Sequence, residues 1–205
     1  MQILWQTPAM MLLMGYVLGS IPFGLLLTRM AGAGDIRAIG SGNIGATNVL
    51  RTGRKGLAAA TLLLDLAKGA GAVCLARVLS PDDAVIAGAA AVIGHLYPIW
   101  LRFRGGKGVA TLMGVATALD WRIGALYAAL WIGVLALARI SSLGGIVAAL
   151  SVPITAALLG RSDLVPIGAG LALLVLWRHR DNIGRLLRGT EPRIGGASNT
   201  PTDAS

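Results

Sequence analysis

The sequence predicts an all-α, polytopic membrane protein that crosses the bilayer about seven times. Its composition, its recurring apolar segments and the distribution of its cations support this prediction. Of the 205 residues, 55% are hydrophobic and 13% are charged, whereas a soluble domain carries roughly 25% charged residues. Apolar runs long enough to cross the hydrocarbon recur along the whole chain, as is typical of polytopic membrane proteins.

Seven apolar segments are the candidate spans. They cover residues 3–28, 56–79, 84–101, 108–119, 123–139, 142–160 and 164–178. The fourth is short for a full crossing and suits a tilted or half-buried helix. The first lacks a basic region before its apolar run, so we expect it to be retained rather than cleaved as a signal peptide. The many glycines and alanines allow close packing of helices in lipid.

The positions of the cations predict the orientation. An odd number of spans puts the two ends of the chain on opposite sides of the membrane. With the N-terminus outside, the outer connections carry only Arg77, Arg122 and Arg161, and all other cations between spans fall inside. Cytoplasmic loops are enriched in Lys and Arg. We therefore expect an outer N-terminus and a cytoplasmic C-terminus, with one integral-membrane domain over residues 1–190 and a flexible polar tail over 191–205.

The net charge of +9 points to anionic lipids and phosphorylated substrates as partners. Nucleic acid is not expected, because the cations flank apolar segments and no array of aromatic side chains for base stacking is present. Cys74 is the only cysteine, and His95 and His179 are the only histidines. The sequence therefore predicts no disulfide within the chain, no metal centre and no cofactor.

Three polar stretches fall on the predicted inner face, and the first runs from residue 41 to 48 as Ser-Gly-Asn-Ile-Gly-Ala-Thr-Asn. Its glycines permit a turn with exposed N–H groups that bind anions. The alternative is a polar turn that only caps the next helix. The density of Gly, Asn and hydroxyl groups favours a ligand, and Arg51 adds a fork suited to phosphate oxygens. The candidate residues are Ser41, Gly42, Asn43, Gly45, Thr47, Asn48 and Arg51.

The second stretch is Arg-Gly-Gly-Lys-Gly at residues 104–108, before an apolar helix. It does not satisfy the Gly-x4-Gly-Lys-[Ser/Thr] pattern around Lys107. Gly105, Gly106 and Lys107 nevertheless suit a phosphoryl group at a helix N-terminus. If the cations only anchored the chain at the inner face, the glycines would have no explanation, so we favour binding.

The third stretch is Arg-His-Arg-Asp-Asn at residues 178–182. His179 and Asn182 are three residues apart and point together on a helix, and we place both in the site. Arg185 and Arg188 continue a cationic stripe, for which contact with anionic lipid is the simpler interpretation.

Asp65, Lys68 and His95 are ionisable residues inside apolar segments. Such groups are costly at membrane depth, and they are usually functional or paired with one another. Asp65 and Lys68 lie three apart on one helix face, so a structural pair and a role at the substrate both stay open. A buried structural role is the preferred interpretation for His95. We place all three behind the site.

The motifs together resemble the acyl-phosphate:glycerol-3-phosphate acyltransferases, the PlsY family of bacterial inner membranes. The resemblance covers residues 1–190. Its motifs are Ser-Gly-Asn-Ile-Gly-Ala-Thr-Asn-Val-Leu-Arg at 41–51, Leu-Asp-Leu-Ala-Lys-Gly at 64–69, Gly94-His95 through Thr111, and His-Arg-Asp-Asn-Ile at 179–183. It implies a seven-span fold in the bacterial inner membrane, with the active site facing the cytoplasm.

The resemblance also implies the reaction. A fatty acyl group would pass from acyl phosphate, not from acyl-CoA or acyl carrier protein, to the 1-hydroxyl of sn-glycerol 3-phosphate. The products would be lysophosphatidic acid and phosphate, in the first step of bacterial phospholipid synthesis. Ser41, Arg51, Lys107, His179 and Asn182 would hold glycerol 3-phosphate. The residues around the donor phosphate would be Gly42, Asn43, Gly45, Thr47, Gly105 and Gly106, with Asn48 also at the substrates.

An acyl phosphate is an activated mixed anhydride, so the enzyme mainly aligns the reactants and stabilises growing charge. Many glycerolipid acyltransferases use a His-x4-Asp pair as the catalytic base and its orienting group, but neither histidine here has an Asp at that spacing. The chain also contains no Gly-x-Ser-x-Gly turn that would present a nucleophilic serine. A phosphate oxygen of a substrate is therefore the expected proton acceptor, without a covalent acyl-enzyme.

Two other classes of function compete with this one. A small transporter of anionic solutes would also use broken helices with glycines, but it predicts polar groups near the midplane and on both faces. A structural scaffold would not explain three phosphate-binding stretches on one side. The concentration of polar residues on one face favours chemistry on a lipid.

Overall fold

The computed structural model describes residues 6–195. All regular elements in this range are helices, which confirms the all-α prediction. The α-helices are α1 (Gln6–Gly19), α2 (Phe23–Met30), α3 (Ala46–Leu50), α4 (Lys55–Leu79), α5 (Ala84–Leu96), α6 (Val109–Leu119), α7 (Trp121–Ala138), α8 (Ser141–Leu158), α9 (Val165–Arg178) and α10 (Arg180–Leu187). Short 3₁₀ helices cover Ile36–Ala38, Pro81–Asp83 and Ile99–Leu101.

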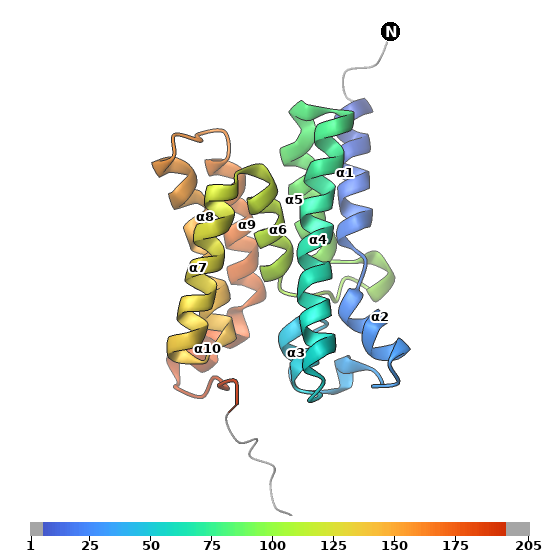
Figure 1. The fold of residues 1–205 in the computed structure, drawn as a ribbon, viewed down its shortest axis with the longest axis vertical. Coiled ribbons are helices and arrows are strands. Elements are labelled where there is room, and N and C mark those ends of the chain that lie inside the picture. The colour runs from blue at the N-terminus through green and yellow to red at the C-terminus, as the bar shows by residue number, and fades with distance from the viewer. Residues whose placement is uncertain (1–5, 196–205) are drawn as a thin grey trace, which may run out of the picture.

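The long helices stand side by side, and the short ones lie at their ends (Figure 1). Helices α1 and α5 pack together with α4, while α7, α8 and α9 form a second group. Helix α6 lies between the groups and contacts α4 on one side and α7 on the other. Helices α2, α3 and α10 lie at the lower end in Figure 1, and the turn from α6 to α7 lies at the upper end.

Four segments in the described range are long and apolar enough to cross a membrane. They are Thr7–Met30, Pro81–Leu101, Trp121–Ala138 and Ser141–Leu158. Val109–Leu119 and Val165–Arg178 are shorter apolar helices. Helix α4 has 25 residues and carries a buried ion pair in its interior. Each of the seven predicted spans coincides with one of these helical segments, and the number of crossings stays a prediction.

The first apolar segment is broken at Ser20–Pro22, where the sequence had predicted one continuous span. Pro22 lacks an N–H and disfavours helical backbone in the preceding residue. The carbonyl oxygens freed by the break find donors: the Trp100 indole lies 2.8 Å from the Ser20 oxygen, and the Lys68 ammonium lies 2.7 Å from the Ile21 oxygen. Side chains from two other segments therefore stabilise the bend.

Helices α4 and α6 approach closely at two glycines. A Cβ added to Gly69 would lie 2.3 Å from the carbonyl oxygen of Thr111, and one added to Gly114 would lie 2.0 Å from that of Leu66. Side chains at these positions would force the backbones apart. Small residues therefore set the separation of the helices, as expected where lipid gives no hydrophobic drive to association.

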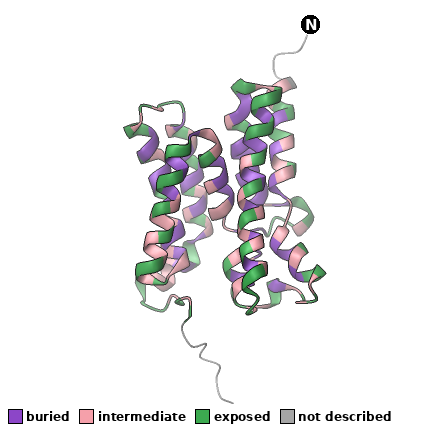
Figure 2. Cartoon of the chain, in the orientation of Figure 1, coloured by how far each residue is buried: buried purple, intermediate pink, exposed green. Residues whose placement is uncertain are grey.

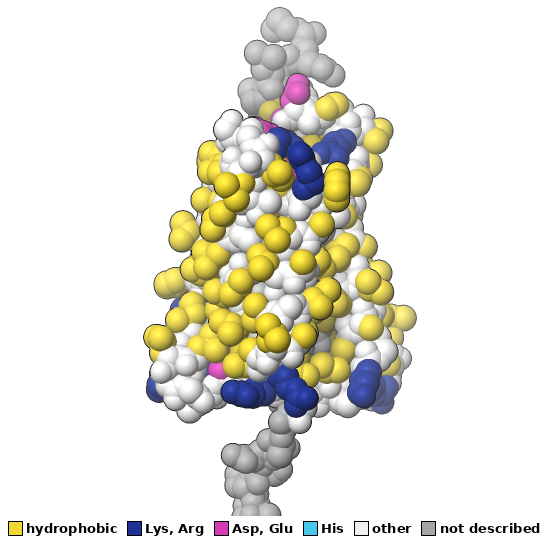
Figure 3. Space-filling model, turned by 60° about the vertical axis from the view of Figure 1, so that its left-hand side comes forward, with side chains coloured by type: hydrophobic (Ala, Val, Ile, Leu, Met, Phe, Trp, Pro, Cys, Tyr) yellow, Lys and Arg dark blue, Asp and Glu magenta, His cyan; other side chains and the backbone are white. Residues whose placement is uncertain are grey.

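The lateral surface of the molecule is apolar. Figure 2 shows the buried residues between the helices, and Figure 3 shows hydrophobic side chains along the flank with Lys and Arg at both ends. Leu137, Leu158 and Val78, which lie on three different helices, are more than four-fifths exposed. In water such a surface would be strongly unfavourable, whereas lipid chains cover it at no such penalty.

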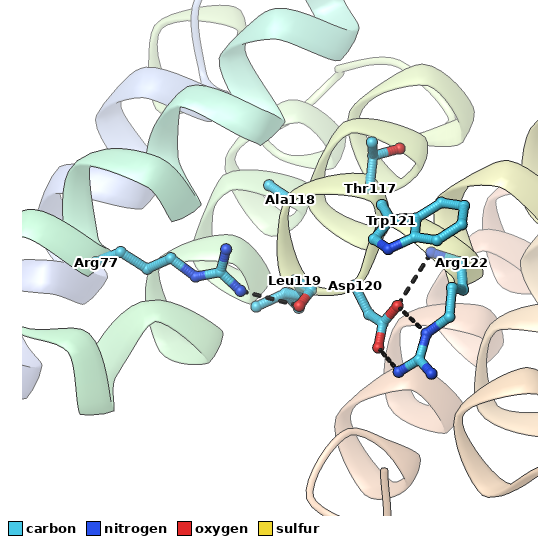
Figure 4. Close-up of a pocket in the computed structure, with 7 residues that line it drawn as sticks. All are labelled: Arg77, Thr117, Ala118, Leu119, Asp120, Trp121 and Arg122. Carbon is cyan, nitrogen blue, oxygen red and sulfur yellow. Dashed lines mark hydrogen bonds and ion pairs between the residues drawn. The ribbon is translucent and has the colours of Figure 1, made fainter. Parts of the chain in front are cut away.

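The cations assigned to the outer connections gather at the turn from α6 to α7, where Figure 4 shows Arg77 and Arg122. Arg77 donates to the carbonyl oxygen of Leu119 at 2.9 Å, and Arg122 donates to Asp120 from both its Nε and Nη2. Arg161 contacts the same Asp120 carboxylate at 3.4 Å. These cations thus lie at one end of the molecule, opposite the end where α3 and α10 lie (Figure 1).

Candidate functional site

A cavity of about 960 Å³ lies where the predicted polar stretches meet. The predicted site residues that line it are Ser41, Asn43, Gly45, Thr47, Asn48, Arg51, Lys107, His179 and Asn182, together with Asp65 and His95. Gly42, Gly105, Gly106 and Lys68 do not line it. Segments more than 130 residues apart in the sequence thus contribute to one cavity.

Asn48 shapes the first stretch. Its side chain is buried, with 3% of the residue exposed. Its Nδ2 donates to the carbonyl oxygens of Ile36, Ile39 and Asn43 at 2.8–3.0 Å, and its Oδ1 accepts from the Ser41 amide at 3.2 Å. These bonds use both ends of the amide, so Asn48 holds the loop in shape around the cavity.

Gly40 makes room for Arg51. Its φ of +57° lies in the left-handed region, and a Cβ there would lie 2.8 Å from Nη1 of Arg51. The Arg51 side chain is exposed, lines the cavity and has no hydrogen-bond partner within residues 6–195. An unpaired guanidinium at a cavity wall is suited to an anion.

Two further polar contacts are made by side chains of the first stretch, one within it and one to α8. Asn43 Oδ1 accepts from the Gly45 amide at 2.9 Å, which forms the turn that leads into α3. Thr47 Oγ1 lies 2.9 Å from Oγ of Ser141 at the start of α8. Ser141 and Ser142 line the cavity and were missed by the sequence analysis. Their only signal was a pair of hydroxyls at the start of an apolar segment.

The second stretch turns sharply against α5. Gly106 donates its amide to the carbonyl oxygen of His95 at 3.0 Å, and Gly105 donates to that of Leu96 at 3.2 Å. A Cβ on Gly106 would lie 1.9 Å from Nε2 of His95. The two glycines are therefore buried behind the cavity wall, while Lys107 and Gly108 form the wall itself.

Lys107 contacts the third stretch directly. Its Nζ donates to Oδ1 of Asn182. Burial lowers the pKa of Lys107 to about 8, Glu191 opposes this, and the positive charges of Arg185 and Arg51 lower the pKa further. Lys107 lies in the loop before α6. With a pKa of about 8, its ammonium keeps its proton at pH 7 and loses it just above.

His179 lies at the junction of α9 and α10, with 2% of its surface exposed. Its Nδ1 donates to the carbonyl oxygen of Val175 at 2.8 Å, since a carbonyl only accepts. Burial lowers the pKa of His179 to about 4, with the bond to Val175 acting in the opposite direction and the positive charge of Lys107 adding to the lowering. The imidazole is therefore neutral at pH 7, and Nε2 is left as an acceptor.

Glu191 completes the cavity wall and was missed, because the sequence analysis placed residues 191–205 in a polar tail. Its Oε1 accepts from Oγ of Ser142 at 2.6 Å and from Nδ2 of Asn182 at 2.5 Å, and its Oε2 accepts from Nε of Arg185 at 2.7 Å. Burial raises the pKa of Glu191, but these hydrogen bonds outweigh burial and hold it below its ordinary value. A single acidic residue in a cation-rich segment was the available signal.

The segment that carries Glu191 continues across the cavity. Residues 191–195 line it, and the Ile194 amide donates to the carbonyl oxygen of Arg139 at 2.7 Å. Residues 196–205 of the predicted tail lie outside the described range. The cavity wall therefore extends past the domain boundary predicted at residue 190.

Asp65, Lys68 and His95 form a buried group beneath the cavity. The Lys68 ammonium lies 2.8 Å from Oδ1 of Asp65 and also donates to the Ile21 oxygen at the bend in the first segment. His95 Nδ1 lies 3.6 Å from the same carboxylate oxygen. Lys68 thus pairs with Asp65 and braces the bend, while Asp65 and His95 also border the cavity.

The chain matches a known protein family along almost its whole length. The family model for glycerol-3-phosphate acyltransferase matches residues 9–189. A glycerol-3-phosphate acyltransferase from Mesorhizobium japonicum is 55% identical over 184 residues, which are 90% of this chain and 94% of the relative. One from Erythrobacter litoralis is 56% identical over 188 residues, which are 92% and 95% of the two chains.

Solved structures show the same similarity. The crystal structure of PlsY, an integral membrane glycerol 3-phosphate acyltransferase, in its glycerol 3-phosphate form has a TM-score of 0.86 and 35% identity, covering 92% of this chain and 96% of PlsY. Its lysophosphatidic acid form has a TM-score of 0.83 and 34% identity, covering 91% and 94%. Both the sequence and the fold therefore lead to one conclusion: this chain belongs to the glycerol-3-phosphate acyltransferase family and is an integral membrane protein.

Proposed function

We propose that this protein transfers a fatty acyl group from acyl phosphate to the 1-hydroxyl of sn-glycerol 3-phosphate, with lysophosphatidic acid and phosphate as products. The observation that carries the proposal is the cavity in which all three polar stretches meet. The relatives are glycerol-3-phosphate acyltransferases, which supports the acceptor, and the two forms of PlsY correspond to the acceptor and the product. The assignment of acyl phosphate as the donor rests on the motif resemblance and on the phosphate-binding groups at the turn before α6.

Glycerol 3-phosphate binds through cations and neutral polar groups from separate segments. Arg51 offers a guanidinium without a partner in the described range, and Lys107 offers an ammonium next to Asn182. Ser41 and the acceptor nitrogen of His179 hold the glycerol hydroxyls. Two cations match a phosphate dianion, and the neutral groups fix the orientation of the glycerol.

The donor phosphate binds at the turn that opens α6. The amides of Lys107 and Gly108 have no acceptor within residues 6–195, and the helix N-terminus that follows favours negative charge. Gly108 has a φ of +85°, which a side chain would strain. Asn43 and Thr47 face the same cavity from the first stretch. The acyl chain lies on the apolar flank of the helices, in the lipid.

In the reaction, the 1-hydroxyl oxygen attacks the acyl carbonyl carbon, and the bond from that carbon to the phosphate oxygen breaks. The hydroxyl proton passes to an oxygen of the phosphate, so no covalent acyl-enzyme forms. His179 is a weak base at a pKa of about 4, and Asp65 is held by Lys68. Alignment of the hydroxyl with the carbonyl is worth roughly 7–11 kcal/mol of barrier in well-oriented reactions.

An assay of the purified protein tests the function. Acyl phosphate and labelled glycerol 3-phosphate are expected to give labelled lysophosphatidic acid and an equal amount of phosphate, whereas acyl-CoA and acyl carrier protein give none. Uptake of label into vesicles without lipid product would contradict the enzyme and support a transporter. Lysophosphatidic acid formed from acyl-CoA would contradict the assignment of acyl phosphate as the donor.

Variants test the site within the same assay. Ser41→Ala, Lys107→Ala and Asn182→Ala are each expected to reduce turnover by about a hundredfold or more. Arg122→Ala, at the opposite end of the molecule, serves as the control with unchanged turnover. Near wild-type turnover in all three site variants would show that the cavity is not the active site.

The proposal includes the topology: seven spans in the bacterial inner membrane, an outer N-terminus and a site that faces the cytoplasm. The separation of Arg77, Arg122 and Arg161 from the remaining cations supports it. Single cysteines placed in a Cys74→Ser background at Ser80 and Gly189 test it. Labelling of both positions from the same side of the membrane would contradict an outer Ser80 and a cytoplasmic Gly189.

A further inference from the structure

We propose that Arg178 is a positioning residue: its guanidinium orients the Gly105–Lys107 turn so that the Lys107 amide faces the cavity and binds a phosphoryl group. The inference rests on the proposed function for the identity of that group, which is the phosphate of the acyl donor. Arg178 does not line the cavity, so it acts on the phosphoryl group only through this turn.

The contacts of Arg178 are specific to this turn. Its Nη2 donates to the carbonyl oxygen of Gly105 at 3.0 Å, and its Nε donates to that of Gly106 at 3.2 Å. The guanidinium carbon lies 5.4 Å from the centre of the Tyr97 ring, which keeps the plane of the fork in place. The planar fork donates to two successive carbonyls in a fixed geometry, whereas a lysine ammonium offers a single nitrogen on a flexible stem.

The geometry of the peptide bond carries the effect to the cavity. In a trans peptide, the carbonyl of one residue and the N–H of the next point in opposite directions. The peptide between Gly105 and Gly106 is held at both ends, since its carbonyl accepts from Arg178 and its N–H donates to the His95 oxygen. That peptide is therefore fixed from behind the wall.

The next peptide is held at one end only. The Gly106 carbonyl accepts from Arg178, so the Lys107 N–H points away from Arg178. This N–H has no acceptor within residues 6–195, and Lys107 lines the cavity. Without the guanidinium, the two carbonyls lose their donors and the glycines, which have no side chain to restrain them, can rotate. Arg178 thereby keeps a free N–H directed at the phosphoryl group.

Arg178 also ends α9 immediately before His179. The same helix end therefore places the imidazole in the cavity and holds the turn that opens α6. This couples the two binding elements in one rigid arrangement, because neither can shift without changing the contacts of the other.

Arg180 is a matched control for Arg178. It too donates to a backbone carbonyl, that of Trp177 at 3.2 Å, and its guanidinium lies 5.0 Å from an aromatic ring. It is exposed and touches neither the turn nor the cavity. A loss seen for Arg178 variants but not for Arg180→Ala therefore reports on the turn.

The experiment compares Arg178→Ala, Arg178→Lys and Arg180→Ala. Arg178→Ala is expected to raise the KM of the acyl phosphate roughly tenfold or more, with a smaller change in kcat, since two charge-assisted hydrogen bonds are lost. The substrate affected shows which phosphate the turn holds. Arg178→Lys recovers only part of the loss, added methylguanidinium lowers the KM of Arg178→Ala, and Arg180→Ala matches the wild type.

A second readout does not need activity. Inorganic phosphate is expected to raise the melting temperature of the wild type and of Arg180→Ala, and to do so for Arg178→Ala only at about tenfold higher concentration. If both KM values and the phosphate dependence of Arg178→Ala equal those of the wild type, the inference is wrong. It is also wrong if methylguanidinium and Arg178→Lys restore nothing, because the loss is then general damage. A wild type that binds phosphate in this Arg178-dependent way but transfers no acyl group contradicts the proposed function and leaves the inference standing.

Discussion

The carboxylate of Glu191 accepts a hydrogen bond from Nδ2 of Asn182 at 2.5 Å, and this contact decides which way the Asn182 amide faces. A carboxylate only accepts, so the NH₂ group is on the side of Glu191. The amide oxygen is then on the side of Lys107, which donates to it. Glu191 therefore orients a group that contacts the cation of the site.

Glu191→Ala is expected to lower both stability and activity. Asn182, Ser142 and Arg185 lose their shared acceptor, and a buried donor left unpaired costs about 1–3 kcal/mol. Thermal unfolding in detergent and the KM for glycerol 3-phosphate measure the two effects. Asp163→Asn is the control, because Asp163 also pairs with an arginine but is exposed at another part of the surface. Equal behaviour of the two variants would contradict the role of Glu191.

The pKa of Lys107, about 8, predicts how activity depends on pH. The ammonium is charged below this value and loses its proton as the pH rises through it, so kcat/KM is expected to fall between about pH 7 and 9. The neutral His179, with a pKa of about 4, does not titrate in this window. A phosphate dianion bound next to Lys107 raises the pKa of its ammonium. The fall in kcat, which reports on the enzyme–substrate complex, is therefore expected at a higher pH than the fall in kcat/KM.

The Lys107→Arg variant tests this assignment, because arginine keeps its charge throughout the range. Its kcat/KM is expected to stay level over the window in which the wild type falls, whatever its absolute rate. A fall of the same size in the variant would assign the titration to another group.

The buried pair of Asp65 and Lys68 predicts strong coupling. Lys68→Met leaves the Asp65 carboxylate buried without its partner and removes a donor from the Ile21 oxygen, which is expected to cost about 3–5 kcal/mol. The double variant Asp65→Leu/Lys68→Met is expected to lose less than the sum of the two single variants. Unfolding in detergent measures all three, and additive losses would contradict the pairing.

Glycines on α4 provide a test of helix packing with a control on the same helix. Gly69→Ala puts a Cβ against the Thr111 carbonyl, and this is expected to cost about 1–3 kcal/mol of stability. Gly71 faces open space, so Gly71→Ala is expected to cause no loss and a gain in helix propensity. Comparison of their melting temperatures checks the prediction, and equal losses would count against the close contact of α4 and α6.

The composition of the three polar stretches and the distribution of the cations together predicted that the stretches meet in one cavity. Glycine, hydroxyl, Asn and Arg side chains in loops next to apolar segments leave phosphate chemistry as the simplest explanation, and the shared side followed from the cations. The abundance of small residues likewise predicted close helix packing, and the structure shows where it occurs, at Gly69 and Gly114.

The role of each residue within a stretch depended on contacts that no local pattern encodes. Asn48 is a residue type that suits ligand binding, yet its side-chain amide donates hydrogen bonds to backbone carbonyls of its own loop. Gly105 and Gly106 lie against α5, because His95 occupies the space behind the turn. The bend at Ser20–Pro22 was obscured by hydrophobic residues on both sides of the proline, although Pro22 itself was a local signal.

The contact of the Ile194 amide with the Arg139 carbonyl bears on how the protein is engineered. An expression variant shortened to Gly189 would lose both Glu191 and this anchor, and with them one side of the cavity. Truncation for crystallisation should therefore keep the chain through Gly195, and a purification handle belongs after that residue.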